Sequence, residues 1–254
     1  MSAKGKVYLV GAGPGAPDLL TLRAARLLER ADIVFFDALV HPDTLALAAH
    51  AEKVAVGKRC GKHSTAQRFI NKRLVDAASR YGVVVRLKGG DPLLFGRAQE
   101  EIDALEQAGV ACEVVPGITA ALAASADVRT SLTRRGLSRH VVFVTPRAGR
   151  GEDEHDWARS ILAADTGAIY MGVGEAERIA ATLMARGVRP DLPVVVVENA
   201  SLPESRSIFL PLSQLGSIAA SGIAGPALIL LGEVYARAQG AVTGIKDDFR
   251  TRVA

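Results

Sequence analysis

Residues 7–28 read VYLVGAGPGAPDLLTLRAARLL, and this stretch guides the interpretation of the whole chain. It opens with an apolar run over 7–10 that ends in glycines, which is typical of a β-strand entering a turn. Beyond the glycines, apolar residues recur at a helical spacing, at Leu22, Ala25 and Leu28. A strand, a glycine loop and an amphipathic helix in succession predict an α/β unit with helices layered on a sheet.

Short apolar runs continue to alternate with amphipathic stretches along the rest of the chain. Strands are expected at 33–36, 54–56, 83–87, 113–115, 141–145, 168–171, 193–198 and 226–234. Helices are expected at 65–79, 97–108, 119–126, 160–164, 175–186 and 212–220. A polar loop at 146–154 marks the expected boundary between two α/β domains, 1–146 and 147–238. A loosely attached tail, 239–254, is expected to follow, and ligands should bind at the carboxyl ends of strands.

Composition places the chain among globular proteins with a substantial core. Its 254 residues are 49% hydrophobic and 23% charged, which excludes a disordered chain. Two cysteines are too few for a disulfide scaffold or a four-cysteine zinc module. Every apolar run is shorter than the roughly 20 residues that span a bilayer. We therefore expect a soluble, cytoplasmic protein without a membrane partner.

The net charge of +4 conceals a strongly basic segment. Between Lys58 and Arg97 there are ten Lys or Arg residues and two acids, Asp76 and Asp91. Such a segment attracts either nucleic acid or a small acidic ligand, and part of it fits an ordinary solvated helix at 65–80. Glycines and apolar strand residues interrupt the segment, which argues against a nucleic-acid tail, but composition alone does not choose the ligand.

The first glycine loop, 11–17, matches a relaxed dinucleotide-binding pattern, with Asp37 in the place of the ribose-binding acid. In a dinucleotide site the loop opens directly into a helix whose N–H groups hold the pyrophosphate. Here Pro14 and Pro17 both lack an N–H, and the helical pattern begins only near residue 19. The loop is better suited to forming the wall of a cleft than to holding phosphate.

Eight blocks of the chain, in the same order, resemble the tetrapyrrole methyltransferases, which use S-adenosylmethionine. They are VYLVGAGPGAPDLLTLRAARLL (7–28), ADIVFFDALV (31–40), VGKRCGKHS (56–64), VVRLKGGDPLLFGR (84–97), VVPGITAA (114–121), IYMG (169–172), VVENAS (196–201) and GPALILLGEV (225–234). Together they cover nearly all of 7–236. The blocks at 31–40 and 56–64 are similar to members acting on uroporphyrinogen III rather than to later precorrin methylases.

This resemblance implies methyl transfer from S-adenosylmethionine to C2 and C7 of uroporphyrinogen III, giving precorrin-2 through precorrin-1 and leaving S-adenosylhomocysteine. The product would enter sirohaem, cobalamin or haem d1 synthesis. The ring carbon is electron-rich and the sulfonium is a good leaving group, so the protein must align them and manage a proton. The resemblance also implies a homodimer, a cofactor cleft between the two domains, no metal and no nucleic acid.

The cofactor contacts that the resemblance implies are small or backbone-exposing residues at several strand ends. They are Pro14, Gly89, Gly90, Asp91, Leu94, Thr119, Ala120, Met171, Ala200 and Ala227. Glycines permit close approach of the backbone to the ligand, since a Cβ would block it. Asp91 is expected near the charged amino-acid end of the ligand, and Met171 with the alanines is expected to line an adenine slot.

The resemblance assigns proton transfer and substrate binding to polar residues. Asp37 takes the place of the proposed base and Lys58 that of the proposed acid, while Arg97, Glu100 and Arg135 match substrate contacts. Arg97 is counted among the catalytic residues as well. The planar fork of arginine suits the acetate and propionate groups of a tetrapyrrole. Cys60 and His63 make only half of a metal site and are expected to be loop features.

Three positions depart from the family pattern: Ala16 replaces an aspartate, Ala98 with Gln99 replaces two glycines, and Arg134 replaces a histidine. The chain lacks the dehydrogenase–ferrochelatase half of fused sirohaem synthases, so we expect it to stop at the dimethylated product. Two alternatives stay open. One keeps the fold with another substrate: a later corrin intermediate, RNA or a protein side chain. The other is a non-catalytic sensor of S-adenosylmethionine, against which the retained Asp37, Lys58 and Arg97 argue.

Overall fold

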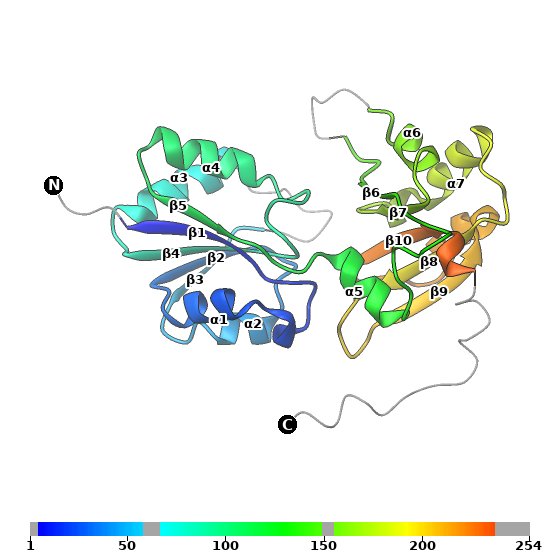
Figure 1. The fold of residues 1–254 in the computed structure, drawn as a ribbon. Coiled ribbons are helices and arrows are strands. Elements are labelled where there is room, and N and C mark those ends of the chain that lie inside the picture. The colour runs from blue at the N-terminus through cyan, green and yellow to red at the C-terminus, as the bar shows by residue number, and fades with distance from the viewer. Residues whose placement is uncertain (1–4, 58–66, 149–154, 237–254) are drawn as a thin grey trace. The chain divides into compact units, whose positions relative to one another are not determined.

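The computed structural model describes residues 5–57, 67–148 and 155–236, and its contacts divide the chain into two compact units (Figure 1). The first unit comprises Met1–Ala123 with Ser201–Pro203, and the second comprises Ala124–Ala200 with Glu204–Ala254. Each unit has its own five-stranded sheet and its own hydrophobic core. The prediction of two α/β units is confirmed.

The first sheet is entirely parallel, with the order β3-β2-β4-β1-β5. Its strands are β1 (Lys6–Gly11), β2 (Ile33–Phe36), β3 (Glu52–Ala55), β4 (Val83–Lys88) and β5 (Cys112–Val115). Parallel neighbours require crossover connections, since a tight turn reverses the chain and can join only antiparallel strands. The helices between these strands are α1 (Leu22–Glu29), α2 (Pro42–Ala46), α3 (Gln67–Ala78) and α4 (Ala98–Gln107), and the 3₁₀ helix η1 (Pro17–Leu19) precedes α1.

Helices cover both faces of this sheet, with α3 and α4 on one face and α1 and α2 on the other (Figure 1). Alternate residues of β1 enter different cores: Val7 and Leu9 pack in the core that contains α3 and α4, and Val10 packs with residues of α1. The central strand β4 is buried along five of its six residues. The predicted strand at 83–87, buried on both faces, is therefore confirmed, although Arg86 interrupts its apolar residues.

The second sheet is mixed, with the order β6-β7-β10-β8-β9. Its strands are β6 (Val141–Val144), β7 (Thr166–Ile169), β8 (Pro193–Glu198), β9 (Arg206–Pro211) and β10 (Ala227–Gly232). Only β6 and β7 are parallel, whereas β10 runs antiparallel to both β7 and β8, and β9 antiparallel to β8. The remaining helices are α5 (Ala120–Asp127), α6 (Trp157–Leu162), α7 (Ala176–Ala185), η2 (Val173–Glu175), η3 (Leu212–Ala220) and η4 (Glu233–Tyr235).

Several elements differ from the sequence-based expectation, among them α2, β9 and η3. The sequence pattern assigns no element to α2 or to β9, whose ends carry prolines. The helix expected at 212–220 is a 3₁₀ helix rather than an α-helix. Its buried residues, Leu212, Leu215 and Ile218, recur every third position, which matches the three residues per turn of a 3₁₀ helix.

The division between the units lies earlier than the expected boundary at 146/147. Strand β6 pairs with β7 along its whole length, so it belongs to the second sheet. The contacts place the division between Ala123 and Ala124, inside α5, and return Ser201–Pro203 to the first unit. The predicted polar loop at 146–154 follows a strand of the second sheet, and its residues 149–154 lie outside the described residues. The tail 239–254 lies outside the described residues.

Among the helices of the described residues, none combines the length and the hydropathy needed to cross a membrane.

Candidate functional site

The carboxyl edge of the first sheet gathers residues that are far apart in the sequence. Pro14 follows β1, Asp37 follows β2, Gly89 follows β4, and Thr119 lies beyond β5. Because these strands are parallel neighbours, their carboxyl ends meet at one edge, where open α/β sheets bind ligands. The structure therefore brings the predicted cofactor residues of the first unit to the same edge as the predicted base.

Four glycines at this edge bring backbone segments into direct contact. The loop after β1 bridges the loop after β4, with hydrogen bonds between Gly13 and Gly90 in both directions at 3.2 and 2.7 Å. A Cβ on Gly11 would lie 2.6 Å from the Cα of Gly117, and one on Gly117 would lie 2.3 Å from the carbonyl oxygen of Gly90. Both positions exclude any side chain, so the three loops can form this edge only with glycine.

Gly90 also leaves room for a ligand. Its φ is +69°, in the left-handed region that favours glycine. Among the described residues, the nearest heavy atom to a Cβ at Gly90 would be the Cα of Thr119, at 4.0 Å. The backbone of Gly90 thus faces a space that a side chain would fill, which fits a predicted cofactor contact.

Both carboxylate oxygens of Asp91 accept backbone hydrogen bonds, one from the N–H of Leu93 at 2.8 Å and one from Gly117 at 2.9 Å. Asp91 therefore joins the loop after β4 to the loop after β5. Its neighbour Leu94 donates its N–H to the Asp91 carbonyl oxygen at 3.3 Å, and Ala120 begins helix α5. The predicted contact of Asp91 with the ligand stays a prediction beside this structural role.

The carboxylate of Asp37 is held by two backbone groups. Oδ1 accepts the N–H of Leu39 at 3.0 Å, and Oδ2 accepts the N–H of Gly89 at 3.2 Å. A Cβ on Gly57 would lie 2.8 Å from the Cα of Asp37, so the chain after β3 passes against it. These contacts fix the predicted base next to a predicted cofactor glycine. The predicted acid, Lys58, lies outside the described residues, as do Cys60 and His63.

Arg97 and Glu100 face each other at the start of α4. Arg97 donates from Nε to Oε1 of Glu100 at 2.6 Å and from Nη2 to Oε2 at 2.8 Å. This hydrogen bonding lowers the pKa of the Glu100 carboxyl. The two side chains are 59% and 50% exposed, so solvent screens the attraction between their charges. Arg97 itself has a positive φ of +56°, which is uncommon for a residue with a side chain.

In the second unit, Met171, Ala200 and Ala227 lie at one edge of the sheet. Met171 follows β7 and Ala200 follows β8, whereas Ala227 begins the antiparallel strand β10 between them. Ala227 pairs with Glu198, and Ile229 pairs with Ile169, so the start of β10 meets the ends of both neighbours. Met171 is partly exposed and has a φ of +55°. Arg135 is an exposed residue in the turn closed by the bridge between Arg134 and Ser138.

Glu198 organises the loop that leads into β10. Its Oε1 accepts the N–H groups of Ala224 and Gly225, each at 2.7 Å, and its Oε2 lies 3.0 Å from Nη2 of Arg206. Burial alone would raise the pKa of Glu198, but the two N–H groups and the Arg206 charge outweigh burial and lower the pKa. Sequence reasoning missed this residue. A lone acid at the end of the apolar run 193–197 is the signal that points to it.

A second missed group is a buried cluster in the first unit, formed by Arg86, Lys88 and Glu101. Arg86 Nε lies 3.0 Å from Oε1 of Glu101, and Lys88 Nζ lies 3.1 Å from Oε2. All three residues are buried. Two cations at alternate positions of an otherwise apolar strand are the sequence signal for such a cluster.

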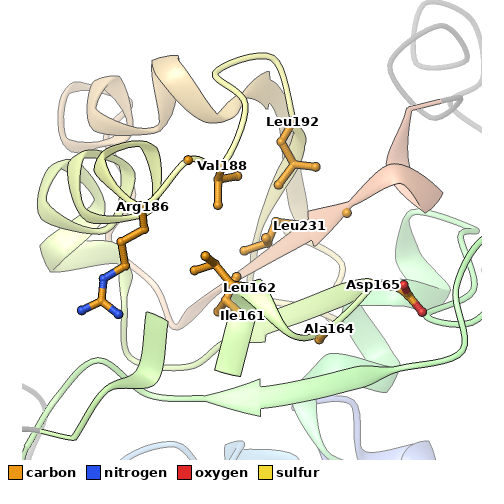
Figure 2. A pocket seen from close by; sticks show the side chains of 10 residues that line it. Ile161, Leu162, Ala164, Asp165, Arg186, Val188, Leu192 and Leu231 are labelled. Carbon is orange, nitrogen blue, oxygen red and sulfur yellow. The ribbon is translucent and has the colours of Figure 1, made fainter. Parts of the chain in front are cut away.

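A cavity of about 270 Å³ lies at the other edge of the second sheet (Figure 2). Ile161, Leu231 and Gly232 are among its lining residues, and Gly232 pairs with Thr166 at the start of β7. Met171 follows the opposite end of that strand. None of the predicted site residues lines the cavity, so it is separate from the candidate site. Within 5–57, 67–148 and 155–236, no group of three or more His, Cys, Asp or Glu residues is arranged to hold a metal ion.

Comparison with known proteins now defines the class. The family model of the tetrapyrrole (corrin/porphyrin) methylases matches residues 6–216. The chain belongs to this family, and the predicted resemblance is confirmed.

Within the family, the chain is 42% identical to the uroporphyrinogen-III C-methyltransferase of Paracoccus denitrificans, over 92% of this chain and 83% of that protein. It is 44% identical to the siroheme synthase of Zymomonas mobilis over 91% of this chain, but covers only 49% of that protein. The chain thus spans about half the length of the siroheme synthases that it matches.

Solved structures give the same result. A uroporphyrin-III C-methyltransferase of Thermus thermophilus, crystallised with S-adenyl homocysteine, is 41% identical and has a TM-score of 0.80. The alignment covers 92% of this chain and 100% of that one. A cobalt precorrin-4 methyltransferase is 29% identical with a TM-score of 0.79 over 90% of this chain.

Proposed function

We propose that this protein transfers methyl groups from S-adenosylmethionine to C2 and C7 of uroporphyrinogen III, forming precorrin-1 and then precorrin-2. The observation that carries the proposal is the similarity to the Thermus methyltransferase bound to S-adenyl homocysteine, which extends over the whole of that chain. The siroheme synthases among the relatives favour sirohaem synthesis as the destination of the product.

The glycine-lined edge of the first sheet fits the cofactor. At the end of β4, a Cβ at Gly90 would occupy open space, whereas one at Gly89 would lie 2.8 Å from the Cβ of Leu39. In this proposal the sulfonium cofactor supplies an activated methyl group and an uncharged thioether as leaving group. The protein's task is then alignment and proton transfer, which require fixed positions rather than a strong nucleophile. We further propose that Met171, Ala200 and Ala227 of the second unit are cofactor contacts.

Asp37 is our candidate for the base that accepts the proton that the macrocycle loses, from an atom other than the methylated carbon, when a ring carbon is methylated. Its carboxylate is held and oriented by the N–H groups of Leu39 and Gly89. A carboxylate held in this way keeps lone pairs free to accept a proton. Lys58 is our candidate for the acid, on the family resemblance alone.

Arg97 is our candidate for binding a carboxylate on the rim of the tetrapyrrole. Its guanidinium already holds the two oxygens of Glu100, in the geometry that a substrate carboxylate would adopt. Because the pair is exposed, exchanging Glu100 for the substrate costs little free energy. Arg135 and Glu100 are proposed as further substrate contacts, and a homodimer as the assembly in the cytoplasm.

The test is anaerobic incubation of the protein with S-adenosylmethionine and uroporphyrinogen III, followed by mass spectrometry of the tetrapyrrole. We expect two added methyl groups; an unchanged macrocycle would contradict the function. If the protein methylated a later corrin intermediate but not uroporphyrinogen III, this result would favour the activity of a precorrin methylase instead.

The role of Asp37 is tested with Asp37→Asn, which keeps an oxygen for a backbone N–H and removes the base. Turnover should fall about 100-fold, a typical contribution of general base catalysis. Binding of S-adenosylhomocysteine, measured by calorimetry, should stay nearly unchanged. Asp43→Asn is the matched control, since the Asp43 side chain is 77% exposed on the next helix. Loss of cofactor binding in Asp37→Asn would refute the role, and so would normal turnover.

A further inference from the structure

The buried cluster of Arg86, Lys88 and Glu101 has no part in the proposed chemistry. Its three residues are 4%, 3% and 0% exposed, and Gln67 adds a hydrogen bond to Oε1 of Glu101 at 3.1 Å. The cluster combines two cations with one carboxylate in the layer between the sheet and α4. Buried charges are costly, and their presence at this place calls for a reason beyond packing.

The two cations serve different neighbours. Arg86 Nη1 donates to the carbonyl oxygen of Leu87 at 3.0 Å and reaches that of Phe35 at 3.5 Å, both within the sheet. Lys88 instead extends beneath the loop formed by residues 91–97. A Cβ on Gly96 would lie 3.1 Å from Cε of Lys88, so the loop packs directly on this side chain.

Lys88 also lies within the electrostatic reach of the candidate site. Burial lowers the pKa of Lys88, and the charge of Arg86 lowers it further, while Glu101 and Asp37 act in the opposite direction. The carboxylates that face Lys88 therefore come from α4 and from the loop after β2. Lys88 connects the predicted base, the loop and the first helix that follows the loop.

The loop above Lys88 is strained. Phe95 and Arg97 have φ values of +54° and +56°, and a Cβ on Gly96 between them would lie 2.6 Å from the Pro92 carbonyl oxygen. Side chains adopt this backbone region only when the surrounding structure enforces it. Glu101 lies one turn into α4 and accepts a hydrogen bond from Lys88, and this bond helps to hold the backbone of the loop in its strained conformation.

We propose that Lys88 is a positioning residue: through its ion pair with Glu101 it holds the strained loop 91–97 in place, so that Arg97 presents its guanidinium to the substrate. The inference rests on the proposed function for its substrate. It concerns a side chain that touches neither reactant.

The test compares Lys88→Met with Arg86→Met, which removes from the same cluster a cation whose backbone partners, Phe35 and Leu87, lie in the sheet. In Lys88→Met, the KM for uroporphyrinogen III should rise about tenfold or more, because small displacements of a binding group are costly. The KM for S-adenosylmethionine should change less than twofold. Arg86→Met should lower the Tm and leave both KM values unchanged. Lys88→Arg, which restores a cation, should recover most of the affinity.

Hydrogen exchange on the unliganded protein provides a measurement independent of turnover. Amides of residues 91–97 should exchange at least tenfold faster in Lys88→Met and at the wild-type rate in Arg86→Met. If the wild-type protein showed no methylation activity, only the proposed function would be refuted. The hydrogen-exchange rates of residues 91–97 would still test whether Lys88 positions the loop. Wild-type exchange or an unchanged KM in Lys88→Met would overturn the inference, as would equal effects in Arg86→Met.

If Lys88→Met does not fold, Lys88→Gln replaces it, because its amide can still donate to Glu101. The expected changes in KM and exchange are then the same in direction. Failure of both variants to fold, with Arg86→Met folded, would show that Lys88 serves folding and would reject the positioning role.

Discussion

The two sheet edges that carry the predicted site residues are built in different ways. In the first unit all neighbouring strands are parallel, so every contribution comes from the carboxyl end of a strand. In the second unit β10 is antiparallel to β7 and β8, so Ala227 comes from the amino end of its strand. The expectation that ligands bind at the carboxyl ends of strands stays a prediction for the parallel sheet. In the mixed sheet, the end that a strand contributes to an edge depends on the direction of that strand.

The packing at the two edges differs as well. In the first unit, Gly11, Gly90 and Gly117 bring backbone against backbone. In the second, Gly225 lies against the side chain of Asn199, whose Oδ1 would be 2.1 Å from an added Cβ. A backbone neighbour cannot move without moving its loop, whereas a side chain can rotate. The first edge should thus be the less tolerant of the two.

The buried acids of the two units also indicate that the first unit should tolerate substitution less well than the second. Glu101 is fully buried between two cations, whereas Glu198 is 8% exposed and is held by two N–H groups and the half-exposed Arg206. Removing the charge of Glu101 leaves two cations without a counter-ion, but removing that of Glu198 leaves one that can reach water. Variants at these positions test whether the two units differ in this way.

The largest effect is expected for Glu101→Gln. It should lower the free energy of unfolding of the first unit by about 3–5 kcal/mol, because buried cations lose their partner. Glu198→Gln should cost the second unit about 2 kcal/mol or less. Denaturant titration followed by circular dichroism reports both units, and the single tryptophan, Trp157 in the second core, reports the second. Equal losses in the two variants would remove the distinction.

A smaller effect is expected for Gly117→Ala, whose Cβ would meet the Gly90 carbonyl oxygen. It should cost about 3 kcal/mol, since the backbone must shift to accommodate it. Gly225→Ala should cost about 1 kcal/mol, the scale of a displaced rotamer at Asn199. In an Asn199→Gly background the cost of Gly225→Ala should disappear, and a double-mutant cycle by thermal unfolding measures this coupling. A Gly117→Ala variant as stable as the wild type would contradict the backbone contact.

The smallest effect is expected for the stability of the second unit at acidic pH. The folded-state pKa of Glu198 lies below its usual value of 4.5, so the unfolded state binds more protons between these two values. The stabilisation by ionised Glu198 is thus present above 4.5 and is lost as the pH falls through the folded-state pKa. Relative to Glu198→Gln, the advantage of the wild type should shrink in this acid range. Trp157 fluorescence in denaturant at several pH values checks it, and a constant difference would contradict the lowered pKa.

Several features could be predicted because they are local. The apolar run at 83–87 and the helical spacing of Leu22, Ala25 and Leu28 correspond to β4 and α1. Glycine at the ends of strands pointed to the loops at Gly13 and Gly90, both of which have positive φ values. The roles of the predicted site residues stay predictions, although the parallel sheet brings those of the first unit to one edge.

Other features depended on distant partners. Strand β9 has a run of only three apolar residues before Pro211, and it is defined by its pairing with β8 along all six residues. The sequence places the domain boundary at 146/147 because the polar loop at 146–154 has the composition of a linker. In the structure, β6 pairs with β7, and this pairing makes β6 part of the second sheet. The cluster around Glu101 was not predicted, since Arg86 and Lys88 meet it only across the layer between sheet and helix.

By itself, the amino-acid sequence determined the α/β alternation, the positions of the glycine loops and the family, because periodicity and motif order are properties of the chain taken in line. Only the tertiary structure decided the direction of β10, the division inside α5 and the partners of Asp37, Arg97 and Glu101. Those depend on hydrogen bonds and buried charges between segments many residues apart, and several pairings can satisfy the same local pattern. Burial of both faces of each sheet selects one of them.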